Sequence, residues 1–67
     1  MKKIFERSDL HAWEKENGDR LTVAKANTYK GVYWTVTFIP NEGKFKILGT
    51  RCTWQQAMAF LAEFEKG

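Results

Sequence analysis

The chain has very few of the residues from which catalytic and metal sites are usually built. It contains one cysteine, Cys52, and one histidine, His11. A single cysteine excludes an intrachain disulfide, and one histidine with one cysteine is too few for a zinc site within the chain. A glycine-rich phosphate loop is also lacking, because Gly31, Gly43 and Gly49 are separated by expected strands. We therefore expect no enzymatic activity, no metal and no cofactor.

Long apolar runs are lacking as well. No run approaches the roughly 18–20 residues that a membrane span needs. The basic start at Lys2 and Lys3 is followed by Glu6, Arg7 and Asp9, where a signal peptide would have an apolar stretch. With the single cysteine, these features predict a cytoplasmic protein without a membrane partner.

Aromatic residues, in contrast, are abundant. The chain is 43% hydrophobic and 15% aromatic, which is typical of a globular protein and argues against disorder. A length of 67 residues predicts one domain, residues 1–67, near the lower size limit for a self-sufficient core. We expect large rings to supply most of that core.

Positive charge is concentrated in the middle of the chain. Residues 20–53 contain six basic side chains against Glu42 alone, a net charge of +5. The segments before and after them each carry a net charge of −1, which gives +3 for the whole chain. Such segregation is what a surface that binds a polyanion needs.

The clearest pattern spans residues 32–64. Residues 32–39 alternate in type and are rich in aromatic and β-branched side chains, which predicts a strand. Residues 40–43 form a turn, and residues 44–49 alternate again. Residues 20–29 read as a preceding strand, with a bulge near Lys25 to restore its alternation and a turn that ends at Gly31.

Thr53 and Gln56 have the spacing of a helix capping box. The residues that follow place one apolar stripe on a helix: Trp54, Ala57, Met58, Phe60, Leu61 and Phe64. Cys52 is expected to pack as a small apolar residue just before the cap, in preference to acting as a reactive thiol. His11 is expected at the surface.

Residues 9–17 allow two interpretations. Ser8 and Asp9 can cap a short helix that stops at Asn17 and Gly18, whereas Asn-Gly is also a strong hairpin signal. The Ala, Glu and Lys content favours the helix. The expected fold is α+β: a three-stranded antiparallel meander packed on one face by a C-terminal helix, with a short N-terminal helix.

Alternation then divides the expected sheet into two faces. Trp34, Val36, Phe38, Phe45 and Ile47 are expected to receive the helix. The other face would carry cations, hydroxyls and a tyrosine ring, which can contact phosphates and base edges. The candidate nucleic-acid-binding residues are Lys30, Tyr33, Thr35, Thr37, Lys44, Lys46 and Arg51.

The order strand–strand–strand–helix resembles the arm-type DNA-binding domain at the N-terminus of tyrosine recombinases. The matching stretches are residues 33–38, residues 42–46 and Thr53-x-x-x-Ala57-x-x-Phe60-Leu61. Arg51-Cys52 departs from the Gly-Phe pair usual before the capping Thr. The resemblance implies DNA contacts from Lys44, Lys46, Thr35 and Thr37. With an N-terminal helix, the element order is also similar to a double-stranded RNA-binding domain, but the lysine cluster of that family is replaced by Trp54-Gln55-Gln56.

Two functions are expected from these patterns. The first is a small nucleic-acid-binding accessory module, with DNA favoured as the partner. The alternative is a protein-interaction module, such as an inhibitor or adaptor of a larger enzyme. A short chain with many aromatic residues and no catalytic constellation fits the accessory proteins of phages or mobile elements. A homodimer is a further alternative, because a small core gains from association.

Overall fold

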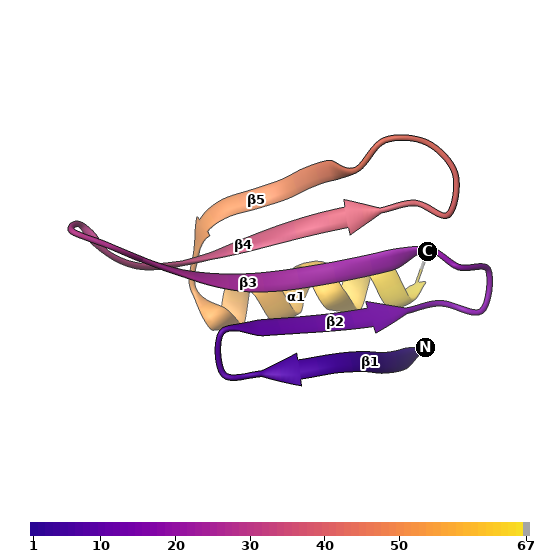
Figure 1. Ribbon diagram of the computed structural model, residues 1–67, viewed down its shortest axis with the longest axis horizontal. Coiled ribbons are helices and arrows are strands. Elements are labelled where there is room, and N and C mark those ends of the chain that lie inside the picture. The colour runs from indigo at the N-terminus through magenta and orange to yellow at the C-terminus, as the bar shows by residue number, and fades with distance from the viewer. Residues whose placement is uncertain (67) are drawn as a thin grey trace.

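The computed structural model describes residues 1–66, which form a five-stranded antiparallel sheet with one helix against one face (Figure 1). The strands follow one another in chain order across the sheet, each paired with the next. The elements are β1 (Lys2–Arg7), β2 (Leu10–Glu14), β3 (Arg20–Thr28), β4 (Gly31–Ile39), β5 (Lys46–Cys52) and α1 (Trp54–Lys66).

The N-terminal residues form two strands, so the expected N-terminal helix and three-stranded sheet were wrong. β1 pairs with β2, with Lys3 opposite Trp13 and Arg7 opposite Leu10. Trp13 is buried in the core, and this burial together with pairing on both sides of β2 outweighs the helix propensity of the segment. Gly18, with a φ of 94°, lies in the hairpin turn that the alternative interpretation predicted.

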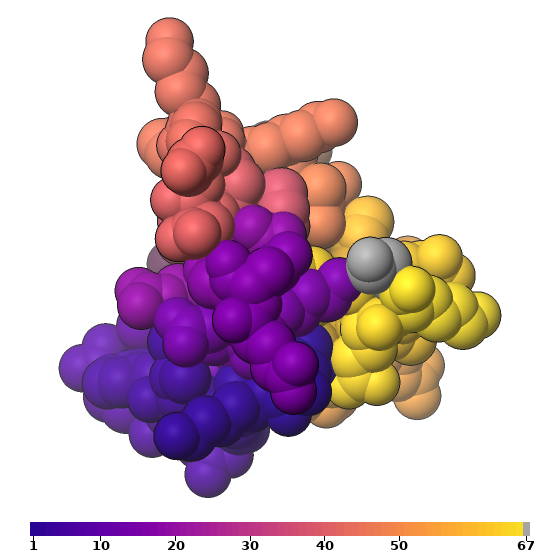
Figure 2. Space-filling model, turned by 90° about the vertical axis from the view of Figure 1, so that its right-hand side faces the viewer, coloured from indigo at the N-terminus to yellow at the C-terminus, as the bar shows by residue number. Residues whose placement is uncertain are grey.

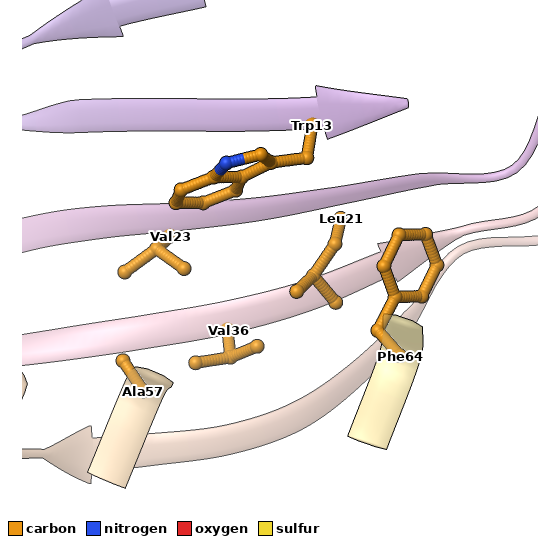
Figure 3. Close-up of a cluster of buried hydrophobic side chains, with 6 residues drawn as sticks. All are labelled: Trp13, Leu21, Val23, Val36, Ala57 and Phe64. Carbon is orange, nitrogen blue, oxygen red and sulfur yellow. The ribbon is translucent and has the colours of Figure 1, made fainter. Parts of the chain in front are cut away.

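The core lies between α1 and the middle of the sheet (Figure 3). Its largest fully buried members come from neighbouring strands: Leu21 and Val23 from β3 and Val36 from β4. Trp13 packs against this core from β2, and the helix contributes its apolar stripe. The helix residues that pack there are Ala57 and Phe64, with Met58, Phe60 and Leu61 partly buried. The expected helical stripe is thus confirmed for these five residues. Trp54, its first expected member, is 38% exposed, with its ring centroid 4.8 Å from that of Trp34.

The pairing of β5 with β4 corrects the expected apolar face. Thr37 lies opposite Ile47 and Val36 opposite Gly49, which leaves Leu48 as an extra residue on β5. The alternation is therefore displaced, and Ile47 is 52% exposed while Leu48 packs on the core. Phe45, in the connection before β5, is 64% exposed. Phe45 and Ile47 were wrongly assigned to the helix side.

The hairpin of β3 and β4 extends beyond the rest of the sheet (Figure 1). Its pairing is continuous from Arg20 opposite Ile39 to Thr28 opposite Gly31, so the expected bulge at Lys25 is absent. The Thr28 hydroxyl donates to the Gly31 carbonyl at 2.9 Å, and it accepts from the Lys30 amide at 3.2 Å. Gly31 has a φ of 127°, as expected for the end of this turn.

The capping box before α1 is confirmed. The Gln56 amide donates to the Thr53 hydroxyl at 3.2 Å, and the Thr53 amide donates to the Gln56 side-chain oxygen at 2.9 Å. Within residues 1–66, no helix combines the length and apolar character that crossing a membrane requires.

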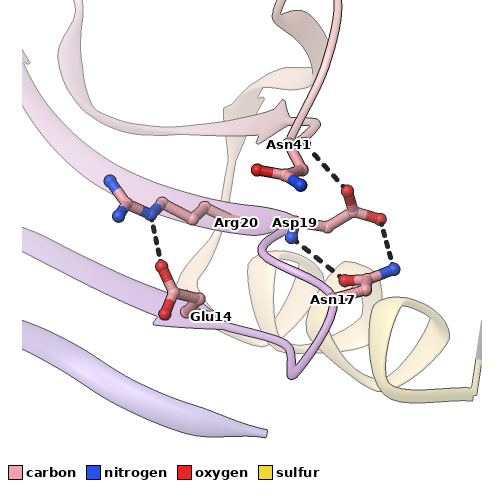
Figure 4. Close-up of polar contacts among 5 residues, drawn as sticks. All are labelled: Glu14, Asn17, Asp19, Arg20 and Asn41. Atoms are coloured by element: carbon pink, nitrogen blue, oxygen red, sulfur yellow. Dashed lines mark hydrogen bonds and ion pairs between the residues drawn. The ribbon is translucent and has the colours of Figure 1, made fainter.

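At the opposite end of the sheet, Asp19 joins two loops (Figure 4). Its carboxylate accepts from the Asn41 amide at 2.9 Å and from the Asn17 side chain at 3.1 Å. The Asp19 amide in turn donates to the Asn17 side-chain oxygen at 3.0 Å. The β2–β3 turn is therefore held to the β4–β5 connection.

Candidate functional site

The face of the sheet that points away from α1, called the outer face here, is the main uncovered surface of the fold. Because side chains alternate along a strand, the neighbours of buried residues such as Val23 and Val36 project to this face. One row of paired residues crosses all five strands on it: Phe5, Ala12, Thr22, Thr37 and Ile47. A second row crosses four strands: Arg7, Leu10, Ala24 and Thr35.

Four of the expected site residues come together on or beside the outer face. Tyr33, Thr35 and Thr37 alternate with the inward-facing Trp34 and Val36 on β4. Arg51, the last but one residue of β5, lies beside them, with its guanidinium carbon 5.8 Å from the Tyr33 ring centroid. Arg51 has a φ of 59° next to a second register shift on β5, and the side chain is thereby directed towards Tyr33.

The three expected lysines lie elsewhere. Lys30 is at the tip of the β3–β4 hairpin, with its ammonium 5.7 Å from the Tyr29 ring centroid. Lys44 is in the β4–β5 connection, which projects from one end of the molecule (Figure 2). Lys46 is paired with Phe38, whose ring packs against Phe64, so Lys46 belongs to the helix side of the sheet. The shifted register of β5 is the reason that Lys46 does not share a face with Thr37.

The sequence interpretation missed a second cation–ring pair on the outer face. Arg7 lies over Phe5 on β1, with its guanidinium carbon 5.4 Å from the ring centroid, and Phe5 is 43% exposed. Tyr29, in the turn at the hairpin tip, is 93% exposed. Residues 2–7, Lys-Lys-Ile-Phe-Glu-Arg, do not alternate in type, so the sequence carried no clear strand signal for β1. The expected helix at residues 9–17 also left this segment without a strand to pair with.

Ion pairs are confined mainly to the N-terminal half of the sheet. Glu14 accepts from Arg20 at 2.7 Å, Arg7 lies 3.3 Å from Asp9, and Lys3 pairs with Glu6. The hydrogen bond from Lys3 and its positive charge lower the pKa of Glu6 below the ordinary value of 4.5. Among residues 1–66, the basic side chains of residues 21–53 form no ion pair: Lys25, Lys30, Lys44, Lys46 and Arg51.

His11 lies in an aromatic cluster on the helix side, which corrects its expected place at the surface. Its side chain is 14% exposed, and its ring centroid is 5.0 Å from Trp54, 6.1 Å from Trp13 and 6.2 Å from Trp34. The buried Nδ1 atom has no hydrogen-bond partner, and Glu6 is 3.9 Å away. The cluster joins β2, β4 and the start of α1. Within the described residues, no three His, Cys, Asp or Glu side chains are grouped to hold a metal ion.

Comparisons with family models, curated proteins and solved structures find no match for this chain. The resemblance to the arm-type domain of tyrosine recombinases therefore stays an expectation.

Proposed function

We propose that this protein is a small, cytoplasmic nucleic-acid-binding module, with DNA as the favoured partner. The observation that carries the proposal is the unpaired positive charge of residues 21–53. Among the described residues 1–66, five cations there have no carboxylate partner, whereas Glu6, Asp9 and Glu14 in the N-terminal half are paired with local cations. Cations left without partners are available to replace the counterions of a phosphate backbone.

The geometry suggests how the contacts are divided. Tyr33, Thr35 and Thr37 supply a ring and two hydroxyls on the outer face, and Arg51 supplies a guanidinium beside them. Lys30 reaches from the hairpin tip. Lys44 and Lys46 lie off the outer face and would contribute to the electric field around it more than to direct contacts.

Fluorescence polarisation with labelled DNA tests the function. We expect affinity to fall steeply between about 50 and 200 mM salt, with a slope that reports the number of phosphate contacts. Arg51→Gln and Lys30→Gln should each weaken binding and reduce that slope by about one contact. Lys66→Gln is the matched control, because it removes the same charge from the end of α1.

Two results would argue against this function. Absence of binding to DNA and RNA at low salt would exclude it, and equal losses in Arg51→Gln and Lys66→Gln would show that only net charge matters. The exposed apolar residues Phe5, Ile39 and Ile47 are the observation that favours the alternative of a protein partner. Absence of any nucleic-acid binding would leave that alternative as the better explanation of this face.

A further inference from the structure

We propose that the nucleic acid is single-stranded and lies across the outer face between the two arginine–aromatic pairs. The inference rests on the proposed function, and it names the form of nucleic acid that this surface fits.

The two pairs are alike in chemistry and lie on the same face. Arg7 is over Phe5 on β1, and Arg51 is over Tyr33 at the junction of β4 and β5. An aromatic ring stacks with any base, and the guanidinium beside it contacts the adjoining phosphate or extends the stack. Stacking of this kind requires unstacked bases, which a single strand presents and a duplex does not.

Between the two pairs the outer face carries small, weakly polar side chains. Ala24 contributes a methyl group, and Thr22, Thr35 and Thr37 contribute hydroxyls. Ala12 also faces away from the helix but is only 7% exposed, because neighbouring side chains cover it. Bases could therefore lie against this part of the outer face, with the threonine hydroxyls available to the base edges.

Size argues against a duplex as the ligand of both pairs. Five strands at a spacing of about 4.8 Å form a surface about 19 Å wide, and three spacings, about 14 Å, separate β1 from β4. The major groove of DNA is about 12 Å wide and admits a helix or a two-stranded ribbon. One groove therefore cannot receive Phe5 and Tyr33 together, although it could admit the β3–β4 hairpin alone.

The charge of the outer face is compatible with a phosphate backbone. Lys2, Arg7, Arg20 and Arg51 lie on it, and Glu14 is the carboxylate among its paired residues. Arg20 neutralises Glu14 through a contact of 2.7 Å. Asp9, in the turn, engages Arg7 through Nε at 3.3 Å, which leaves the two terminal NH₂ groups of this guanidinium for another acceptor.

The test compares fluorescein-labelled oligothymidylate of about 12 nucleotides with a duplex of equal length, at low salt and with the whole chain. We expect the single strand to bind more tightly. Phe5→Leu and Tyr33→Leu keep apolar bulk but remove the ring, so each should weaken single-strand binding about fivefold or more. Phe45→Leu is the matched control, since Phe45 is an exposed aromatic residue outside the outer face.

Circular dichroism and a thermal melt of each variant establish that a loss of binding is not a loss of fold. As a second readout on the unmodified protein, oligothymidylate should slow amide hydrogen exchange in β1, which lies far from the hairpin tip.

The outcomes separate this inference from the proposed function. Preference for the duplex, or loss of binding in Tyr29→Leu and Lys30→Gln with none in Phe5→Leu and Tyr33→Leu, would overturn the single-strand inference and assign binding to the hairpin. The nucleic-acid function would survive that result. Failure to bind either form would overturn both.

Discussion

Gly18 occupies the turn between β2 and β3 in a backbone conformation that other residues rarely adopt. Its φ is 94°, and its amide donates to the Lys15 carbonyl at 3.0 Å. A Cβ atom at this position would lie 2.8 Å from the Asn41 side chain. Two separate requirements, a positive φ and close approach of another loop, therefore demand glycine here.

We expect Gly18→Ala to lower the free energy of unfolding by more than the roughly 1 kcal/mol typical of strain at a positive φ. Gly31→Ala is the control, because Gly31 has a φ of 127° but a Cβ atom there would meet nothing within 4 Å beyond its chain neighbours. Urea denaturation followed by fluorescence measures both. Equal losses would show that the contact with Asn41 adds nothing.

At the scale of single elements, the helix is defined at its start by local chemistry and along its length by burial. Thr53 and Gln56 satisfy each other's amides, and Ala57 and Phe64 are buried against the sheet. Gly49 lets β5 approach this helix, since a Cβ there would be 2.9 Å from the Phe60 ring. The approach of β5 sets the position of α1 over β4.

Thr53→Ala should destabilise the protein by about 1 kcal/mol, because the Gln56 amide loses its acceptor. Thermal unfolding monitored at the helix band of circular dichroism gives the value. Thr50→Ala, an exposed threonine on β5, serves as the control and should cost less. If Gln56→Ala added its full effect to Thr53→Ala, the two side chains would not be acting as one reciprocal cap.

Across the whole molecule, stability is distributed unevenly. The largest fully buried side chains come from β3 and β4, whereas every residue of β1 is exposed. β1 is an edge strand, and its one neighbour in the sheet is β2. Elements with few buried contacts open at lower free energy than the core of the same protein.

Native-state hydrogen exchange should therefore show the least protected strand amides in β1 and the most protected in β3 and β4. Two-dimensional NMR of the free protein gives the protection of each amide. Protection of β1 equal to that of β3 would mean that the sheet opens only as one cooperative unit.

Local sequence patterns were sufficient wherever neighbouring residues decide the structure. Gly31 provides the turn conformation, Thr53 and Gln56 form the cap, and the helical stripe packs as its spacing predicts. The alternation of β4 correctly put Tyr33, Thr35 and Thr37 on one face. The positive charge of the middle of the chain can be counted directly from its letters.

The sequence by itself thus determined the central hairpin, the capped helix and half of the candidate site. Tertiary structure alone decided that residues 2–14 form strands, because the local preference of Ala, Glu and Lys for helix is weaker than pairing and burial of Trp13. It also decided the register of β5, where one extra residue reverses which side chains share a face. Both decisions depend on partners distant in the chain, and they brought Arg7 and Phe5 onto the same face as Tyr33 and Arg51.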